Sequence, residues 1–141
     1  MNLLIIEDDA ICTFINNRVA QTSGIFNHVH SVKNGKEALD YFQDIAAGYG
    51  NIPAPDIILL DLNMPVLNGF DFITALRQLS FPNKENISII ILTSSNDSLD
   101  HQRARALGVD KYLLKPLSVN ELQTTIFSLD KKVWKKSLKC A

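Results

Sequence analysis

Residues 57–65 of this chain read Ile-Ile-Leu-Leu-Asp-Leu-Asn-Met-Pro, and this stretch decides the fold. Its first four residues are continuously apolar rather than alternating, which is typical of a strand buried on both faces. Strands of that kind belong to parallel sheets that carry helices on each side. Asp61 follows the run directly, so we expect an acidic side chain at the carboxyl end of a central strand.

Four other strand candidates lie on either side of this stretch. Residues 3–6, 87–92 and 112–114 are also apolar or nearly so, with Ser88 as the one polar residue. Residues 28–32 alternate between polar and apolar side chains, which is typical of an edge strand. The sequence therefore predicts five strands, with the weakest one at an edge of the sheet.

Helical patterns separate the five strand candidates. The apolar residues expected on shared helical faces are Ile11, Phe14, Ile15 and Val19; Ala38, Leu39, Phe42 and Ile45; Phe70, Ile73, Leu76 and Leu79; and Val119, Leu122, Ile126, Leu129 and Val133. Residues 99–107 are polar and only weakly amphipathic, and Gly108 is typical of a helix end. This alternation predicts an α/β fold, a doubly wound parallel sheet with strand order 2-1-3-4-5 and helices on both faces.

The composition narrows the class of protein. A chain of 141 residues with 46% hydrophobic and 21% charged residues suits one ordinary domain. The net charge of -1 gives no field that would attract nucleic acid or an anionic membrane. No apolar run approaches the roughly 20 residues that span a bilayer, and no signal peptide is evident. Cys12 and Cys140 lie near opposite ends, so we expect a reduced, cytoplasmic protein.

Polar side chains follow the predicted strands at the places where ligands bind in such folds. In an open parallel sheet, the binding crevice lies at the carboxyl ends of the strands, where the strand order reverses. That point falls between the first and third strands. The residues expected along this edge are Glu7, Asp8, Asp9, Asp61, Thr93, Ser94 and Lys115.

This set of side chains indicates a particular chemistry. Several carboxylates in one crevice repel one another, and a hard divalent cation such as Mg²⁺ relieves that repulsion through oxygen ligands. Lys115 adds a second positive charge from the far side of the crevice. Carboxylates, Mg²⁺, a hydroxyl group and a lysine are suited to hold a phosphoryl group, because phosphoryl transfer depends mostly on positioning and charge neutralisation.

The same residues resemble a known family, the receiver domain of two-component response regulators. The resemblance rests on Glu7-Asp8, Asp61, Thr93 and Lys115-Pro116, and on residues 61–69, which are similar to the family's phosphoacceptor loop. It covers nearly the whole chain. It implies a flavodoxin-like fold, a receiver domain over residues 1–130, and a basic extension of the last helix over residues 131–141.

The resemblance also implies roles at the acidic cluster. Asp61 would accept a phosphoryl group from a histidine kinase or a histidine phosphotransfer protein. The chain would catalyse only its own phosphorylation and dephosphorylation. Asp8, Asp61 and the backbone carbonyl of Asn63 would bind Mg²⁺ directly, and Glu7 would do so through a water molecule.

On the opposite side of the crevice, the resemblance assigns a switch. Thr93 and Lys115 would bind oxygens of the phosphoryl group, and a cis peptide bond before Pro116 would aim the lysine inward. Tyr112 matches the family's switch aromatic. The output surface would comprise the fourth helix, the fifth strand and the fifth helix, and would bind a downstream protein. The expected state is a monomer or a phosphorylation-dependent dimer.

Several features have simpler explanations. Asp9 is best interpreted as a helix N-cap, and Cys12 as a small core residue. His28 and His30 are interpreted as a solvated pair, since no third metal ligand lies near them in the sequence. Residues 46–55 form a long loop away from the predicted site. The lysines of residues 131–141 are interpreted as a solvated extension rather than a binding surface.

Three alternative functions remain at this point. A Mg²⁺-dependent aspartyl phosphatase typically needs a second acid two residues after its nucleophile, where this chain has Asn63. A receiver-like binding module that is never phosphorylated would not need the intact set of residues. A dinucleotide-binding domain would need a glycine-rich turn after the first strand. With no helix-turn-helix segment after the last helix, we expect the signal to leave through protein–protein contacts.

Overall fold

The computed structural model describes residues 1–50 and 52–129. The order of the elements is β1 (Asn2–Ile6), α1 (Ala10–Ser23), β2 (His28–Val32), α2 (Gly35–Ala47), β3 (Ile57–Leu60), α3 (Gly69–Gln78), the 3-10 turn η1 (Lys84–Asn86), β4 (Ser88–Thr93), α4 (Ser98–Ala106), β5 (Lys111–Leu114) and α5 (Val119–Phe127). All neighbouring strands are parallel, in the order β2-β1-β3-β4-β5. The predicted flavodoxin-like sheet is therefore confirmed, with β2 at one edge.

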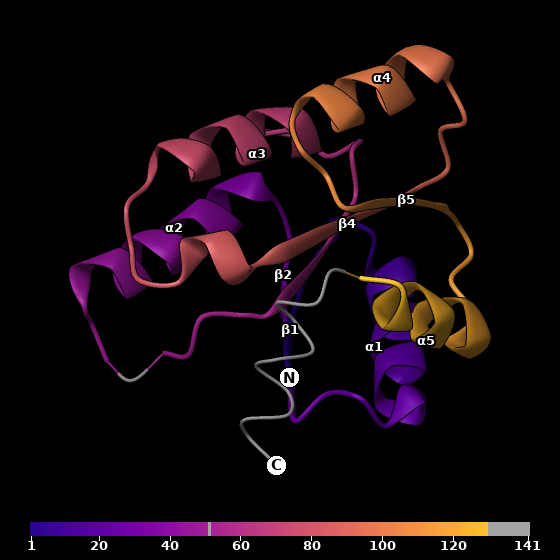
Figure 1. Cartoon of the computed structure of the whole chain (residues 1–141), viewed down its shortest axis with the longest axis horizontal. Coiled ribbons are helices and arrows are strands. Elements are labelled where there is room, and N and C mark those ends of the chain that lie inside the picture. Colours follow the sequence, from indigo (N-terminus) through magenta and orange to yellow (C-terminus); the bar gives the residue numbers. More distant parts are fainter. Residues whose placement is uncertain (51, 130–141) are drawn as a thin grey trace.

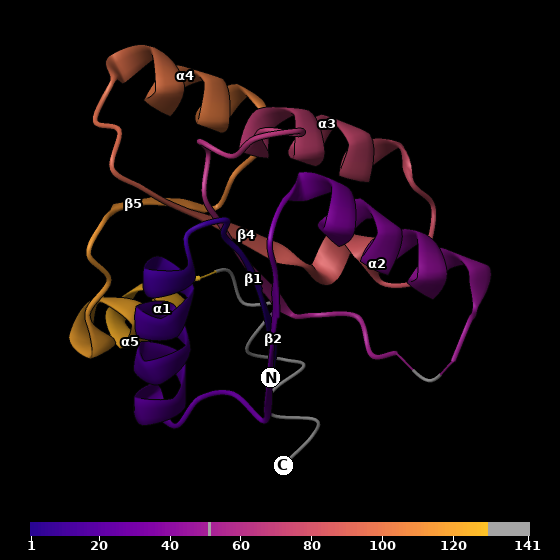
Figure 2. The same ribbon diagram turned by 180° about the vertical axis from the view of Figure 1, so that it is seen from behind.

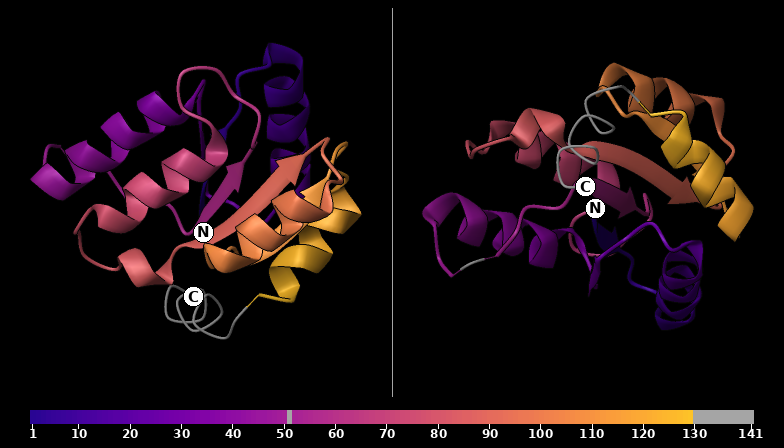
Figure 3. Two further views of the ribbon diagram at one scale, coloured as in Figure 1. Left: turned by 90° about the horizontal axis from the view of Figure 1, so that it is seen from above. Right: turned by 60° about the horizontal axis from the view of Figure 1, so that its bottom comes forward.

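Helices cover both faces of the sheet. The helices α1 and α5 lie together on one side, and α2, α3 and α4 lie on the other (Figures 1 and 2). The strands cross the molecule side by side between these two layers (Figure 3). Every residue of the central strands β3 and β4 is buried, which explains why β3 and the middle of β4, residues 89–92, are apolar without alternation.

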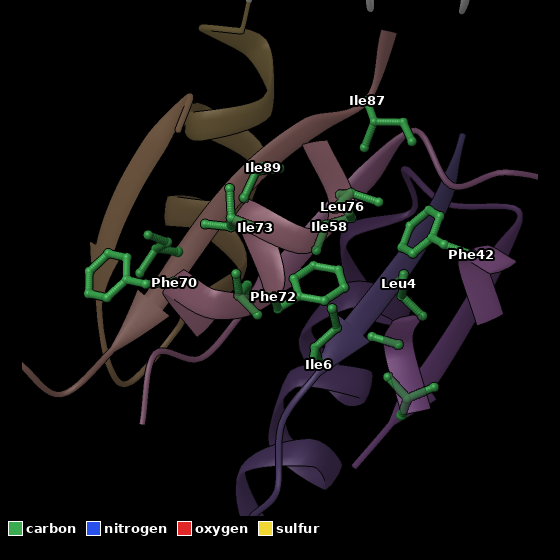
Figure 4. Packing of buried hydrophobic residues seen from close by; sticks show 14 of the residues in the cluster. Leu4, Ile6, Phe42, Ile58, Phe70, Phe72, Ile73, Leu76, Ile87 and Ile89 are labelled. Atoms are coloured by element: carbon green, nitrogen blue, oxygen red, sulfur yellow. The ribbon is translucent and has the colours of Figure 1, made fainter. Parts of the chain in front are cut away.

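Two hydrophobic cores lie on the two faces of the sheet. On the face of α2 and α3, Leu4, Ile58 and Ile89 pack beneath Phe42 and Phe72, whose ring centroids are 6.1 Å apart (Figure 4). On the other face, the alternate strand residues pack against α1 and α5. Each strand thus contributes side chains to both cores. This packing on two faces holds the ends of the strands in place.

Short polar residues start the helices that follow the strands. Asn34, Asn68 and Ser118 cap α2, α3 and α5 by accepting hydrogen bonds from backbone N–H groups in the first turn. Gly69 brings α3 close to the end of β3, since a Cβ atom there would lie 2.7 Å from the backbone oxygen of Asp61. A glycine at this point therefore lets α3 begin directly against Asp61.

One helical face differs from the prediction. Of the predicted apolar face of α1, Val19 packs against the core, but Ile11, Phe14 and Ile15 are 71%, 66% and 41% exposed. The fully buried residues of α1 are small or polar ones, Asn16, Ala20 and Ser23. The predicted burial was therefore wrong for these three apolar residues, which form an apolar stripe exposed to solvent.

Other predictions hold with small shifts. The apolar faces of α2, α3 and α5 pack into the cores as predicted, and Gly108 after α4 has the expected left-handed conformation with φ 76°. The strand β4 is displaced by one residue, because Ile87 ends the 3-10 turn before it. Val133 and the predicted basic extension at 131–141 lie outside the described residues. Among the described helices, none is long and apolar enough to cross a membrane.

A comparison of a buried phenylalanine, Phe42, with an exposed one, Phe14, tests this packing. We expect Phe42→Ala to lower the free energy of unfolding by about 3–5 kcal/mol, because the ring is fully buried between α2 and the sheet. Phe14→Ala should change it by no more than about 0.5 kcal/mol, since its ring is mostly exposed. Urea unfolding of both variants measures the difference. Equal losses would contradict the assignment of the two faces.

Candidate functional site

The predicted site residues meet at the carboxyl edge of the sheet. Glu7 and Asp8 follow β1, Asp61 follows β3, Thr93 ends β4, and Lys115 follows β5. The backbone ladder continues into this edge, because the N–H of Asp61 donates to Ile6 O over 3.1 Å and that of Lys115 donates to Thr93 O over 2.9 Å. Regular strand pairing therefore fixes the positions of these side chains.

Three carboxylates form the acidic cluster of the site: Glu7, Asp8 and Asp61. Each offers one oxygen atom, and these atoms lie within 4.8 Å of one another. Glu7 and Asp61 are only 3% and 6% exposed, whereas Asp8 is open to solvent. Two buried anions thus lie beside one exposed anion at the mouth of the site.

Lys115 reaches across the site to the two buried carboxylates. Its Nζ atom lies 3.0 Å from Glu7 Oε2 and 3.4 Å from Asp61 Oδ2. The peptide bond between Lys115 and Pro116 is cis, as predicted. One ammonium group therefore bridges both buried anions.

The titration of this cluster reflects burial and crowding. Burial raises the pKa of Glu7 above 4.5, and the negative charge of Asp61 raises it further, while Lys115 works in the opposite direction. Burial works to lower the pKa of Lys115, but the hydrogen bond to Glu7 and the charge of Asp61 outweigh it and raise that pKa. A single lysine does not fully compensate two buried carboxylates, so the cluster favours a further cation.

The donor atoms suit a hard divalent cation. Three carboxylates provide only oxygen ligands, which Mg²⁺ and Mn²⁺ both accept. Asn63 lies beside them, and its N–H donates to Asp61 Oδ1 over 3.4 Å. The role of the Asn63 carbonyl as a further ligand stays a prediction.

Asp9 does not take part in the acidic cluster. Its Oδ1 accepts hydrogen bonds from the N–H groups of Ile11 at 2.8 Å and Cys12 at 3.3 Å, so it is the N-cap of α1. The sequence interpretation of this residue is therefore confirmed. Its own N–H donates to Glu7 Oε1 over 3.2 Å, which ties the cap to the buried carboxylate.

On the β4–β5 side, Ser95 connects the predicted switch residues. The hydroxyl of fully buried Thr93 accepts from the N–H of Ser95 over 3.3 Å, and the hydroxyl of Tyr112 donates to Ser95 O over 2.8 Å. Ser95 Oγ donates to Asp100 of α4 over 2.7 Å. The ring of Tyr112 packs on His101, with centroids 3.8 Å apart. The roles assigned to Thr93 and Tyr112 stay predictions, and their connection through Ser95 was not predicted.

Cys12 lies closer to the site than predicted, whereas His28 and His30 lie away from it. Cys12 is only partly buried, and its Sγ lies 3.7 Å from Lys115 Nζ, so its interpretation as a core residue was wrong. It could have been found, because the first turn of a helix that starts at this edge passes close to the site. His28 and His30 begin β2 at the opposite edge of the sheet and are remote from the carboxylates.

Comparison with known proteins agrees with this arrangement. Residues 3–127 match the family model of the response regulator receiver domain. The chain is 28% identical over 132 residues to the probable methanogenesis regulatory protein FilR2 of Methanothrix harundinacea, covering 94% of this chain and 82% of that protein. It covers less than half of some other curated relatives.

Solved structures are also similar. A two-component response regulator from Cytophaga hutchinsonii superposes with a TM-score of 0.80 at 32% identity, over 95% of this chain and 96% of that one. The Mn²⁺-bound form of the response regulator Rcp1 superposes with a TM-score of 0.69 at 28% identity, over 89% and 88% of the two chains.

The raised pKa of Glu7 predicts how stability depends on pH. Without divalent ions, the folded protein holds the Glu7 proton more tightly than the unfolded chain does, so this group costs stability as the pH rises above 4.5 toward its folded pKa. Glu7→Gln removes this titration. We therefore expect the melting temperature of the wild type minus that of Glu7→Gln to fall as the pH is raised toward neutrality.

Thermal melts of both proteins over this range, with and without MgCl₂, measure the effect. The ion should reduce the fall, because it compensates the buried charges. A difference in melting temperature that increases with pH would contradict the proposed crowding of Glu7 and Asp61.

Proposed function

This chain belongs to the response regulator receiver domain family, and we propose that Asp61 is the residue that accepts a phosphoryl group. Its family makes the chain a phosphoacceptor module of two-component signalling rather than a classical enzyme. The observation that carries the assignment of Asp61 is its central position. Glu7 also lies in the acidic cluster and contacts Lys115, but Asp61 follows β3, which lies between β1 and β4, and its carboxylate is 3.4 Å from Lys115 Nζ.

The transfer step follows from the groups around Asp61. A carboxylate oxygen of Asp61 attacks the phosphorus atom, and the bond between phosphorus and the donor's histidine nitrogen breaks. The histidine ring, which carries a proton on its other nitrogen, takes up the electron pair of that bond and leaves as a neutral imidazole. A carboxylate needs no general base for this attack. Lys115 Nζ lies beside Oδ2 and the Asn63 N–H beside Oδ1, so both residues orient the carboxylate before the transfer.

The acidic cluster is proposed to hold Mg²⁺. Asp8, Asp61 and the backbone carbonyl of Asn63 would bind it directly, and Glu7 through a water molecule. When bound, this ion supplies positive charge to the phosphoryl oxygens and offsets the repulsion among the carboxylates. A similar protein, the response regulator Rcp1, has a solved Mn²⁺-bound form, which supports the binding of a divalent ion by this chain. The contact between Glu7 and Lys115 supports a second role for Glu7, the positioning of the lysine.

Phosphorylation is proposed to alter the hydrogen bonds that Ser95 makes with Thr93, Tyr112 and Asp100. The phosphoryl group carries roughly one and a half to two negative charges, and the bond to it removes the charge of the Asp61 carboxylate, so the site gains about one negative charge, located on the phosphoryl oxygens. Thr93 and Lys115 would bind its oxygens, and Thr93 would then give up its hydrogen bond with Ser95. Because Ser95 also accepts from Tyr112 and donates to Asp100, the change would reach α4 and β5. We propose the surface of α4, β5 and α5 as the output surface for a downstream protein.

Besides the downstream protein, the chain needs a partner that donates the phosphoryl group. The family implies a kinase, and we propose a histidine kinase or a histidine phosphotransfer protein in the cytoplasm. The apolar stripe of Ile11, Phe14 and Ile15 supports docking of such a donor, since α1 starts directly after Asp8 and Asp9 and its exposed stripe lies beside the site. Burial of this stripe against the donor would position the histidine near Asp61.

The phosphoacceptor assignment is tested with a small phosphodonor. Incubation with acetyl phosphate and MgCl₂ should give one base-labile phosphoryl adduct on the wild type, measured by intact mass. Asp61→Asn should give none, because the nucleophilic oxygen is lost. Asp71→Asn, which alters an exposed carboxylate at the start of α3, serves as the control and should react as the wild type does.

An adduct that persists in Asp61→Asn would show that another residue is the acceptor. Continuous release of phosphate from many small esters, without a stoichiometric adduct, would favour an aspartyl phosphatase.

The donor surface is tested by a second variant. Phe14→Asp should slow phosphotransfer from the histidine-phosphorylated donor by about tenfold, equivalent to about 1.4 kcal/mol of lost binding, because it places a charge in the docking surface. Phosphorylation by acetyl phosphate should be unchanged, since Phe14 does not contact the cluster. Tyr49→Asp, which alters an equally exposed aromatic residue at the opposite edge, is the control. Equal effects of both variants on the protein donor would refute this docking surface.

A further inference from the structure

Basic side chains gather where α3 and α4 end, on the face of the sheet that these two helices cover (Figure 1). Residues 1–129 hold nine of the 14 lysines and arginines of the chain but fourteen of its 15 aspartates and glutamates. Five of these nine basic residues, which we call the basic patch, are Arg77, Lys84, Arg103, Arg105 and Lys111. They fall within residues 77–85 and 103–111, where Glu85 and Asp110 are the acidic residues. The rest of residues 1–129 is left with four basic and twelve acidic side chains.

Contacts between α3 and α4 hold two arginines of the basic patch in place. Arg77 Nη2 donates to Leu107 O over 3.3 Å and to Gly108 O over 3.4 Å, which ties the end of α3 to the end of α4. The guanidinium carbon of Arg103 lies 4.4 Å from the centroid of the Phe70 ring. Both arginines nevertheless stay exposed to solvent. Two guanidinium groups are therefore positioned at the surface before any partner binds.

These contacts leave most of the positive charge of the patch uncompensated. Among the residues that the structure describes, the ion pairs involve Lys115 alone. Arg77 and Lys84 donate to backbone carbonyls at the helix ends, which carry only partial negative charge. Asp110 Oδ2 accepts a hydrogen bond from the N–H of Ile89 over 2.8 Å, so this carboxylate is engaged with the backbone. The patch thus presents an excess of positive charge on a chain that is otherwise acidic.

Two cavities open within the basic patch, with volumes of about 490 and 210 Å³. Each one is lined by two basic residues of the patch and by apolar side chains. The lining of the first includes Arg77, Leu79, Phe81 and Lys84, and that of the second includes Ala104, Arg105, Val109, Lys111 and Tyr112. A segment that carries both carboxylates and apolar side chains matches this combination.

We propose that the basic patch binds an acidic segment of the downstream protein, whose carboxylates pair with Arg105 and Lys111 and whose apolar side chains enter the two cavities. The patch overlaps α4 and β5, so this inference names the partner chemistry of the proposed output surface and rests on that function. The acidic majority on the rest of the chain repels such a segment, which directs it to the patch. Nucleic acid is also attracted by positive charge, but contacts to phosphates leave the apolar walls of the cavities unoccupied.

A synthetic peptide serves as the probe for this surface. A fluorescein-labelled peptide rich in glutamate, with one leucine and one phenylalanine, is titrated with the unphosphorylated full-length protein, and binding is measured by fluorescence anisotropy. Arg105→Glu combined with Lys111→Glu should weaken binding about tenfold or more, since it reverses the charge beside the smaller cavity. Lys33→Glu combined with Lys36→Glu makes the same change of charge at exposed residues around the start of α2. This control should weaken binding by no more than about twofold, because distant charges are screened.

Two further measurements locate the bound peptide and check the variants. The changes in backbone amide shifts that the peptide causes, measured by NMR, should fall within residues 77–85 and 101–112. Binding should weaken as the salt concentration rises, since salt screens the charges of the patch. Far-UV circular dichroism shows whether both double variants are folded.

The absence of binding at low salt would overturn the proposal, and so would equal losses in the two double variants, because only net charge would then matter. Equal binding of a peptide with glutamine in place of glutamate would also overturn it. Duplex DNA that binds more tightly than the peptide, and is lost in the same variant, would assign the patch to nucleic acid instead. The titrations use unphosphorylated protein, so their outcome is separate from that of the acetyl phosphate test of Asp61.

Discussion

The burial of two carboxylates side by side is the constraint on which the rest of the site depends. Glu7 and Asp61 are withdrawn from water at neighbouring strand ends, where their charges repel and raise the free energy of the ionised cluster. Lys115 offsets part of this cost by contacting both. Any cation that binds, and any group transferred to Asp61, acts on a cluster that is already under electrostatic stress. The affinity that we propose for a divalent ion therefore follows from how the fold places these two residues.

The sheet can hold such a cluster because its centre is rigid. Hydrophobic cores on both faces enclose β3 and β4, so the strand ends cannot move apart to relieve the repulsion. Gly69 allows α3 to start directly against the backbone of Asp61, which closes the site on another side. The exposed position of Asp8 leaves one side open to solvent. The resulting site is fixed at its base and accessible at its mouth.

The strands and the acidic cluster could be predicted because both follow from simple rules. Continuous apolar runs indicate strands covered on both faces, and parallel strands bring their carboxyl-end residues to one edge. The orientation of α1 could not be predicted in this way. Its apolar residues have the spacing of a buried face, yet the helix packs through Asn16, Ala20 and Ser23, because small side chains allow close approach to the sheet and to α5. The hydrophobic pattern therefore indicated where the helix is, but not which side is buried.

Contacts between distant residues were the other part that the sequence did not reveal. The position of Cys12 beside Lys115 depends on the exact start of α1, and the stacking of His30 on Tyr41 depends on how α2 lies over β2. Ser95 is a further example, because nothing in its local sequence indicates that it joins Thr93, Tyr112 and Asp100. Its backbone N–H and carbonyl face two different strands, so any movement of Thr93 alters the support of Tyr112. In the proposed switch, a change at Asp61 would need to displace only the hydrogen bond between Thr93 and Ser95 to disturb β5 and α4 together. Coupling through so few groups would depend on the rigid sheet that surrounds them.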